Sequence, residues 1–182
     1  MRSALGGLAR SMRAGDVDAD SHEAVWAQVS QIDLDMARVR DALHVPDDAG
    51  ELAAPLEVLL RRIPDGWGRW IDCDAGWYPI LVNLDAQLAT LDPDYQVQQI
   101  KEKFGTLRFY CSAHIDDADA SARFDELVRA AEKASAVTCE RCGRPGALCE
   151  TASRWYKTLC TGCVDAIAAE GGGRYQSVKR SS

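Results

Sequence analysis

The chain has 182 residues, of which 47% are apolar, enough to bury a core in one domain with appendages or in two small domains. Its formal net charge is −7, and of the stretches 1–60, 61–138 and 139–182 only the last is net basic, which argues against a protein that coats nucleic acid. No apolar run is long enough to span a bilayer, and the arginine-containing N-terminus lacks the apolar stretch of a secretion signal. We therefore expect a cytoplasmic protein without a membrane partner.

The first third of the chain is predicted to be a tail followed by helices. Residues 1–20 are expected to be a disordered tail, and residues 21–62 to form an N-terminal helical segment. Apolar residues at alternating spacings of four and three predict a helix over 22–44, which ends before Pro46. Its apolar seam consists of Val25, Val29, Ile32, Met36, Val39 and Leu43. This helix either packs on its own domain or pairs with a second copy or a protein partner.

Residues 63–138 are predicted to form an α+β core. After a short helix over 51–62, a turn rich in proline and glycine occupies 64–68. The dipeptide Gly76-Trp77 then opens a central helix with a leucine-rich seam. A last helix is expected near 119–135, and it leads the chain to the first cysteine pair.

A β-hairpin is predicted between the central helix and this last helix. Residues 95–102 and 106–112 have strand-like patterns and are joined across 103–105. In the first of these strands Val97 and Ile100 are out of phase with a simple alternation. This spacing predicts a β-bulge between them.

Two Cys-x-x-Cys pairs near the C-terminus predict a metal site. The four expected ligands are Cys139, Cys142, Cys160 and Cys163. Two pairs at this spacing are typical of a structural zinc ion held by four thiolates. With the turns and short strands between the pairs and a helix after the second, they predict a treble-clef-like zinc finger over 139–170. Cys149 lies inside this module and is a possible competing ligand, whereas Cys73 and Cys111 are expected to be small buried apolar residues. The glycine-rich end, 171–182, is expected to be a disordered tail.

The residue pattern disfavours an enzyme but does not exclude one. Four thiolates saturate a tetrahedral zinc ion and leave no position for water, so we predict no catalytic residue there. The histidines that a treble-clef nuclease needs for a second metal do not follow Cys139. The chain also has no glycine-rich phosphate loop and no nucleophile elbow.

Four stretches of the chain resemble a group of uncharacterised small proteins of bacteria and their phages. The stretches are 76–81 (GWYPIL), 97–110 (VQQIKEKFGTLRFY), 138–143 (TCERCG) and 155–160 (WYKTLC). The resemblance covers about residues 72–165 and leaves out the N-terminal helix. It implies a bacterial or phage cytosolic protein with a zinc site, and it implies no known reaction. The last zinc ligand of such proteins is often histidine, whereas this chain has Cys163.

Cationic and aromatic residues on the hairpin and in the zinc module are candidates for binding a partner. The candidates are Lys101, Lys103, Arg108, Tyr110 and Lys157. Strand alternation places the hairpin residues near one another, and such a face suits phosphate or an acidic protein surface. The alternative is that these charges pair with Glu102 and other local carboxylates. Trp77 and Trp155 are expected to pack in the core or the zinc module.

The sequence therefore predicts a non-enzymatic, zinc-stabilised interaction protein. Its partner would be another protein, as in toxin immunity or a phage accessory role, for which the acidic body would suit a basic toxin. The alternative is a nucleic-acid-binding regulator that uses the basic zinc module and the Lys/Arg hairpin.

Overall fold

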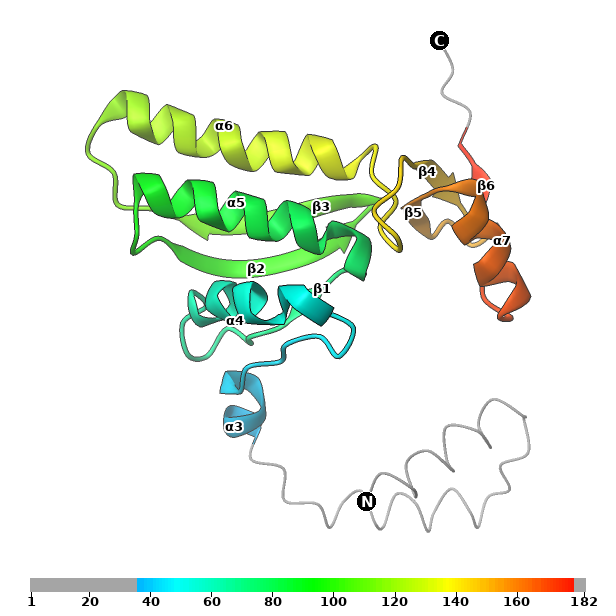
Figure 1. Ribbon diagram of the computed structural model, residues 1–182, viewed down its shortest axis with the longest axis horizontal. Helices are drawn as coiled ribbons and strands as arrows, with labels where there is room; N and C mark the ends of the chain where they lie inside the picture. Colours follow the sequence, from blue (N-terminus) through cyan, green and yellow to red (C-terminus); the bar gives the residue numbers. More distant parts are fainter. Residues whose placement is uncertain (1–35, 179–182) are drawn as a thin grey trace. The chain divides into compact units, whose positions relative to one another are not determined.

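The computed structural model describes residues 36–178, and the chain divides into two compact units, 1–39 and 40–182 (Figure 1). The predicted tail over 1–20 and most of the predicted helix over 22–44 lie outside the described residues. Helix α3 (Met36–Asp41) ends at Asp41, earlier than expected. The reason is that His44 already pairs with the core: its backbone N–H donates to the carbonyl of Arg69 at 3.0 Å, and it forms a parallel bridge with Trp70.

The second unit has mixed α and β structure, as predicted. Its elements in chain order are η1 (Gly50–Leu52), α4 (Ala53–Arg61), β1 (Ile71–Asp72), η2 (Ala75–Trp77), α5 (Tyr78–Leu91), β2 (Gln96–Lys103), β3 (Thr106–Ser112), α6 (Ala118–Ser135), β4 (Ala147–Glu150), β5 (Tyr156–Leu159), α7 (Thr161–Ala169) and β6 (Gln176–Ser177). None of the helices within the described part of the chain is long and apolar enough to cross a membrane.

Strands β1, β2 and β3 form one sheet in that order. The β2–β3 hairpin is antiparallel and contains the predicted bulge, located between Val97 and Gln99. The bulge lets Val97 and Ile100 both face the core despite their odd spacing, and each is at most 1% exposed. Strand β1 pairs parallel to β2 and was not predicted, because two residues carry no readable alternation.

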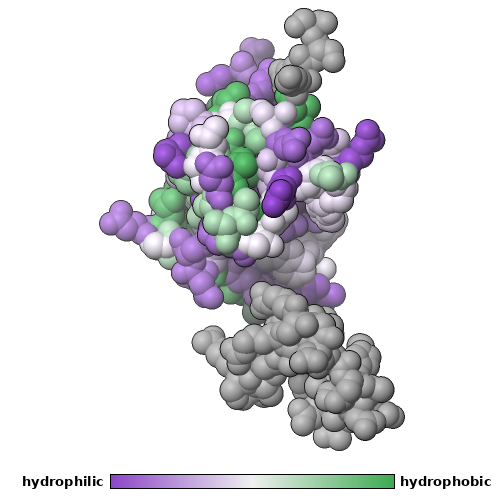
Figure 2. Space-filling view, turned by 90° about the vertical axis from the view of Figure 1, so that its right-hand side faces the viewer, coloured by the Kyte–Doolittle hydropathy of each residue, from purple (hydrophilic) through white to green (hydrophobic). Residues whose placement is uncertain are grey.

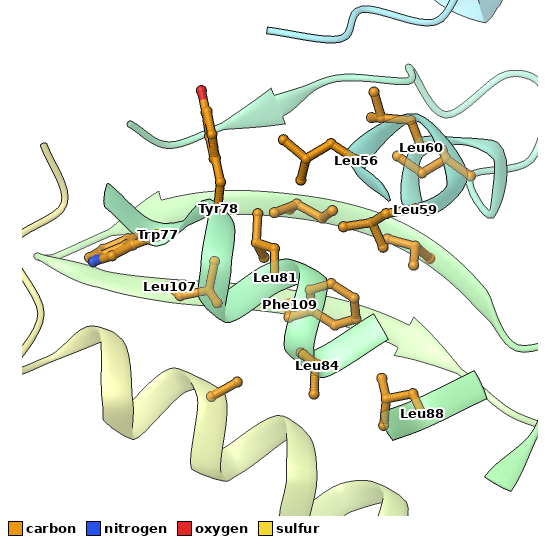
Figure 3. Close-up of a cluster of buried hydrophobic side chains, with 14 of the residues drawn as sticks. Leu56, Leu59, Leu60, Trp77, Tyr78, Leu81, Leu84, Leu88, Leu107 and Phe109 are labelled. Carbon is orange, nitrogen blue, oxygen red and sulfur yellow. The ribbon is translucent and has the colours of Figure 1, made fainter. Parts of the chain in front are cut away.

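Within residues 36–178, helices cover one face of this sheet and leave the other face open. Helices α5 and α6 lie side by side over β2 and β3, and α4 packs against α5 (Figures 1 and 3). The apolar seams that they share with the sheet form the main core, which includes Leu56, Leu59, Leu60, Trp77, Leu81, Leu84, Leu88, Leu107 and Phe109. Burial of these side chains is the main stabilising term for this part of the chain.

The outer edge of β3 is closed by side chains of α6. The backbone N–H of Leu107 donates to Oγ of Ser135 at 2.8 Å, and that of Phe109 donates to Oε1 of Glu132 at 3.3 Å. Because these groups of the edge strand are already bonded, this stretch does not offer a free ladder to an added strand.

The C-terminal part, called the finger below, has a sheet of its own with the strand order β5-β4-β6. The structure differs here from the predicted disordered tail over 171–182. Gln176 pairs with Glu150, and Ser177 pairs with Cys149. Tyr175, just before β6, packs against the small apolar cluster of the finger. The glycine-rich composition concealed this short strand, whose pairing depends on β4.

Candidate metal centre and adjoining surfaces

The structure brings the four predicted cysteine ligands together. The Sγ atoms of Cys139, Cys142, Cys160 and Cys163 all lie within 4.8 Å of one another, and those of Cys142 and Cys160 are 3.6 Å apart. A tetrahedral zinc ion with Zn–S bonds of about 2.3 Å separates its sulfur ligands by about 3.8 Å. The donor set and its spacing therefore fit a four-thiolate metal site. When bound, such an ion cross-links the two cysteine pairs.

The first cysteine pair lies on a tight turn. The backbone N–H of Gly143 donates to the carbonyl of Cys139 at 2.8 Å, and the N–H of Cys139 donates to the carbonyl of Arg144 at 2.7 Å. Gly143 has a φ of +75°, which glycine adopts without the steric cost of a side chain. The Cys-x-x-Cys-Gly sequence thus folds locally so that both sulfurs point to one centre.

The second cysteine pair lies at the start of α7. Cys160 is the N-cap residue of this helix, and the N–H of Cys163 donates to the carbonyl of Cys160 at 3.1 Å. The positive end of the helix dipole favours the negative charge of thiolates. The guanidinium of Arg144 adds to this field, because it donates to Sγ of Cys142 at 3.4 Å and of Cys160 at 3.5 Å.

These surroundings shift the thiol pKa values in both directions. Hydrogen bonds from Arg144 lower the pKa of Cys142 to about 6, and the backbone N–H of Cys163 lowers the pKa of Cys160. Burial raises the pKa of Cys163 to about 12. A bound zinc ion would deprotonate all four thiols; the lowered pKa values of Cys142 and Cys160 favour this deprotonation, and the raised pKa of Cys163 opposes it.

The remaining cysteines do not belong to the metal centre. Cys149, considered as a competing ligand, lies in the apolar cluster of the finger, and its Sγ is 3.4 Å from the carbonyl of Ala147. Cys73 and Cys111 are partly buried against the main core, and burial raises the pKa of both thiols. They therefore behave as the small apolar residues that the sequence suggested.

The Gly76-Trp77 dipeptide anchors the first cysteine turn on the core. The N–H of Gly76 donates to the carbonyl of Glu140 at 2.7 Å, and the indole N–H of Trp77 donates to the carbonyl of Thr138 at 2.8 Å. A Cβ at position 76 would collide with the carbonyl oxygens of Cys139 and Glu140. This close approach explains a glycine at the start of a helix, and Trp77 is fully buried, as expected.

Lys157 is held inside the contact between finger and core, where sequence reasoning had made it a candidate for binding a partner. Its Nζ lies 2.8 Å from Oδ2 of Asp74 and 2.9 Å from Oε1 of Glu140. Burial raises the pKa of Glu140 to about 7, against the opposing effect of Lys157. For Lys157 burial alone would lower the pKa, but the bond to Asp74 and the charge of Glu140 raise it above its ordinary value. The positive charge of Lys157 is thus paired with carboxylates of the same chain.

The other four candidates lie on the face of the sheet that no helix in the described part of the chain covers, called the open sheet face below. Lys101 is paired in register with Arg108, and its Nζ lies 5.5 Å from the centre of the Tyr110 ring. Arg108 donates to Oγ1 of Thr106 at 2.6 Å. Within residues 36–178, no carboxylate oxygen lies within 4.0 Å of the charged nitrogens of Lys101, Lys103 or Arg108.

Glu102, the suspected partner of these cations, faces the other way. It is paired with Leu107 on the core side of the hairpin, and its Oε1 accepts from the N–H of Gly105 at 2.5 Å. The hairpin cations therefore keep their charge for the solvent or a ligand.

Trp155 differs from its prediction, since it was expected to pack in the core or the zinc module. Its side chain is 70% exposed, and it follows Arg154 at the end of the β4–β5 turn. Thr151 and Ser153, residue types that favour turns, are the sequence feature that indicates a position for this tryptophan at the end of the β4–β5 hairpin.

Comparisons of the chain with protein families, with curated proteins and with solved structures gave no match.

Proposed function

We propose that this chain is a non-enzymatic binding protein in which structural zinc stabilises a treble-clef-like finger and the open sheet face binds an acidic segment of a protein partner. The fold order of the finger supports the treble clef: a cysteine turn, the β4–β5 hairpin and a second pair at the start of α7. Four thiolates leave zinc no position for a reacting water. The chain would act in a reducing bacterial or phage-infected cytosol, where thiols stay on metal.

The observation that carries this proposal is the set of unpaired cations beside an exposed aromatic ring. Lys101, Lys103 and Arg108 lack carboxylate partners among the described residues, and Tyr110 is 45% exposed next to them. Arginine and tyrosine are over-represented among the residues that dominate protein–protein binding energy. A folded protein with net negative charge that keeps such a cluster unpaired offers it to an anionic partner.

The acidic partner gains further contacts from a hollow next to these cations. A hollow of about 790 Å³ is lined by Trp67, Gln99, Lys101 and Tyr110 and by residues of α6 that include Phe124, Asp125 and Arg129. Trp67 is 59% exposed, so both an aromatic surface and amide groups lie beside the charges. Such mixed lining suits a peptide segment, which brings both donors and acceptors.

Single-stranded nucleic acid is the second candidate, and the same aromatic rings favour it. Tyr110 and Trp67 could stack with bases while the cations contact phosphates. Against it, the contact set is small and the chain as a whole is acidic, so few phosphates would be neutralised.

Fluorescence anisotropy at low salt with two labelled probes, an oligoglutamate peptide and an oligothymidylate, separates the candidates. We expect the peptide to bind and the double variant Lys101→Glu/Arg108→Glu to weaken it at least about tenfold. The control Arg123→Glu/Lys133→Glu changes the net charge equally at two positions of α6 that do not line the hollow, and it should keep the affinity. Tighter binding of the oligothymidylate would favour the nucleic-acid-binding regulator. If neither probe binds, both the peptide-binding and the nucleic-acid-binding function are refuted.

A further inference from the structure

A second surface, separate from the open sheet face, lies where the tip of the β2–β3 hairpin meets the finger. This surface, called the junction groove below, has a cavity of about 430 Å³. Its lining consists of Glu102, Lys103, Phe104, Ser153, Arg154, Trp155 and Tyr156. It therefore takes one wall from each hairpin.

Contacts between the two hairpins fix the width of the junction groove. The hydroxyl of Thr158 donates to the carbonyl of Gly105 at 2.6 Å, and a Cβ on Gly105 would collide with Leu148. The rings of Phe104 and Tyr156 meet edge to face with centroids 6.3 Å apart. Because β5 continues directly into Cys160, the metal centre supports one of these walls.

Two large apolar side chains of the junction groove face solvent. Trp155 is 70% exposed and Phe104 is 64% exposed. Figure 2 views the molecule from the finger end and shows apolar and hydrophilic residues mixed over that face. Exposed aromatic rings held on two rigid tips are costly in water and are typical of binding anchors.

Backbone conformation singles out the same groove. In the part of the chain that the structure describes, Phe104 and Arg154 are the only residues other than glycine with a positive φ, at +55° and +62°. Phe104 and Gly105 are the two central residues of a hairpin turn for which asparagine-glycine is the preferred sequence. A bulky ring in this conformation is unfavourable for stability, and such outliers gather at functional sites.

The charges of the junction groove favour a peptide. Lys103 lies over the Phe104 ring at 5.3 Å, and neither Lys103 nor Arg154 forms an ion pair within residues 36–178. Glu102 and Ser153 add acceptors to the lining. A peptide can place acidic side chains at Lys103 and Arg154 and backbone N–H donors at Glu102 and Ser153, whereas an ionised polyphosphate has no donor for Glu102.

We propose that the junction groove anchors an extended peptide segment of the partner, with one aromatic side chain against Phe104 and Trp155 and acidic residues at Lys103 and Arg154. This inference rests on the proposed function, because Lys103 also belongs to the open sheet face and joins the two surfaces. The aromatic anchor gives the acidic partner its specificity.

The test compares two labelled peptides on the full chain with its metal: an oligoglutamate with one central tryptophan and the same peptide with alanine. We expect the wild type to prefer the tryptophan peptide about tenfold, the usual contribution of a buried anchor. Trp155→Ala and Phe104→Asn should abolish this preference. Val58→Ala, which truncates an exposed apolar side chain on α4, is the control and should keep it.

The variant Phe104→Asn also separates a binding role from a structural one. Asparagine suits the turn, so its Tm should be equal to or above that of the wild type while the peptide preference is lost. A lower Tm, or a preference that survives both variants, would overturn the inference. If an oligothymidylate binds in a Trp155-dependent way and the peptides do not, the occupant is nucleic acid and the peptide is excluded. If both peptides bind equally, only the inference fails; if neither binds, the proposed function fails.

Discussion

The main core and the finger are stabilised in different ways, although they are parts of one compact unit. The core buries long apolar side chains from three helices and a sheet (Figure 3). The buried cluster of the finger consists of Leu159 and three cysteines, with a few partly buried neighbours. So small an apolar cluster cannot offset the conformational entropy of some forty residues, and a metal ion held by the four cysteines would supply the missing stabilisation. The surface between them therefore depends on both parts: the core positions the β2–β3 hairpin, and a bound metal would position the β4–β5 hairpin.

Removing the metal should give the largest difference between the core and the finger. We expect Cys139→Ser, or a strong chelator, to unfold the finger while the core stays folded, since structural zinc contributes on the order of 10 kcal/mol. NMR should show loss of dispersed amide signals from 139–178 and retention of those from 78–112. Native mass spectrometry should find one zinc in the wild type and in the control Cys149→Ala. A metal-free wild type with an intact finger would contradict this.

A substitution in the core should weaken the core and leave the finger intact. Leu81 is fully buried against the sheet, and Leu81→Ala should lower the free energy of unfolding by about 2–5 kcal/mol through lost burial and a cavity. The variant should still bind one zinc, because the four cysteines and their turns are untouched. Urea denaturation and metal analysis check both parts, and loss of zinc would show that the finger does not hold its metal independently of core packing.

Gly76→Ala tests the contact between the two parts. The added methyl group would press on the carbonyl oxygens of Cys139 and Glu140, so finger and core must separate slightly. We expect a loss of about 1–3 kcal/mol. Hydrogen exchange of the Trp77 indole N–H should speed up, because that group bonds to Thr138 across this contact. Unchanged exchange would mean that the contact adapts without opening.

The smallest expected effect is a pH dependence of stability that comes from Asp92, a residue of the core part. Backbone N–H groups of His114 and Asp94 hold the pKa of Asp92 below its ordinary value. A carboxyl with a lowered folded-state pKa stabilises the protein above its unfolded value, near 3.9, and this contribution is lost as the pH falls below it. Asp92→Asn should therefore be less stable at neutral pH, and the gap should narrow near pH 3. Midpoints of urea unfolding read from core signals measure this, and a gap that widens in acid would contradict it.

The hairpin, its bulge, the helix over 118–135 and the four metal ligands could be read from the sequence alone. Each is encoded locally: the odd spacing of Val97 and Ile100 requires a bulge, and two Cys-x-x-Cys pairs have few other uses. Strand β1 and strand β6 could not be read in this way, since two residues become a strand only when a distant neighbour pairs with them.

Residue type and spacing are enough to identify the four cysteines that can bind a metal, because ligand chemistry depends on these two properties. How the charged and aromatic side chains are used depends on tertiary contacts. The fold pairs Lys157 with Asp74 and Glu140, keeps Lys101 and Arg108 away from the carboxylates of residues 36–178, and exposes Trp155. The physical reason is that burial and ion pairing depend on segments far apart in the chain, which local patterns do not report.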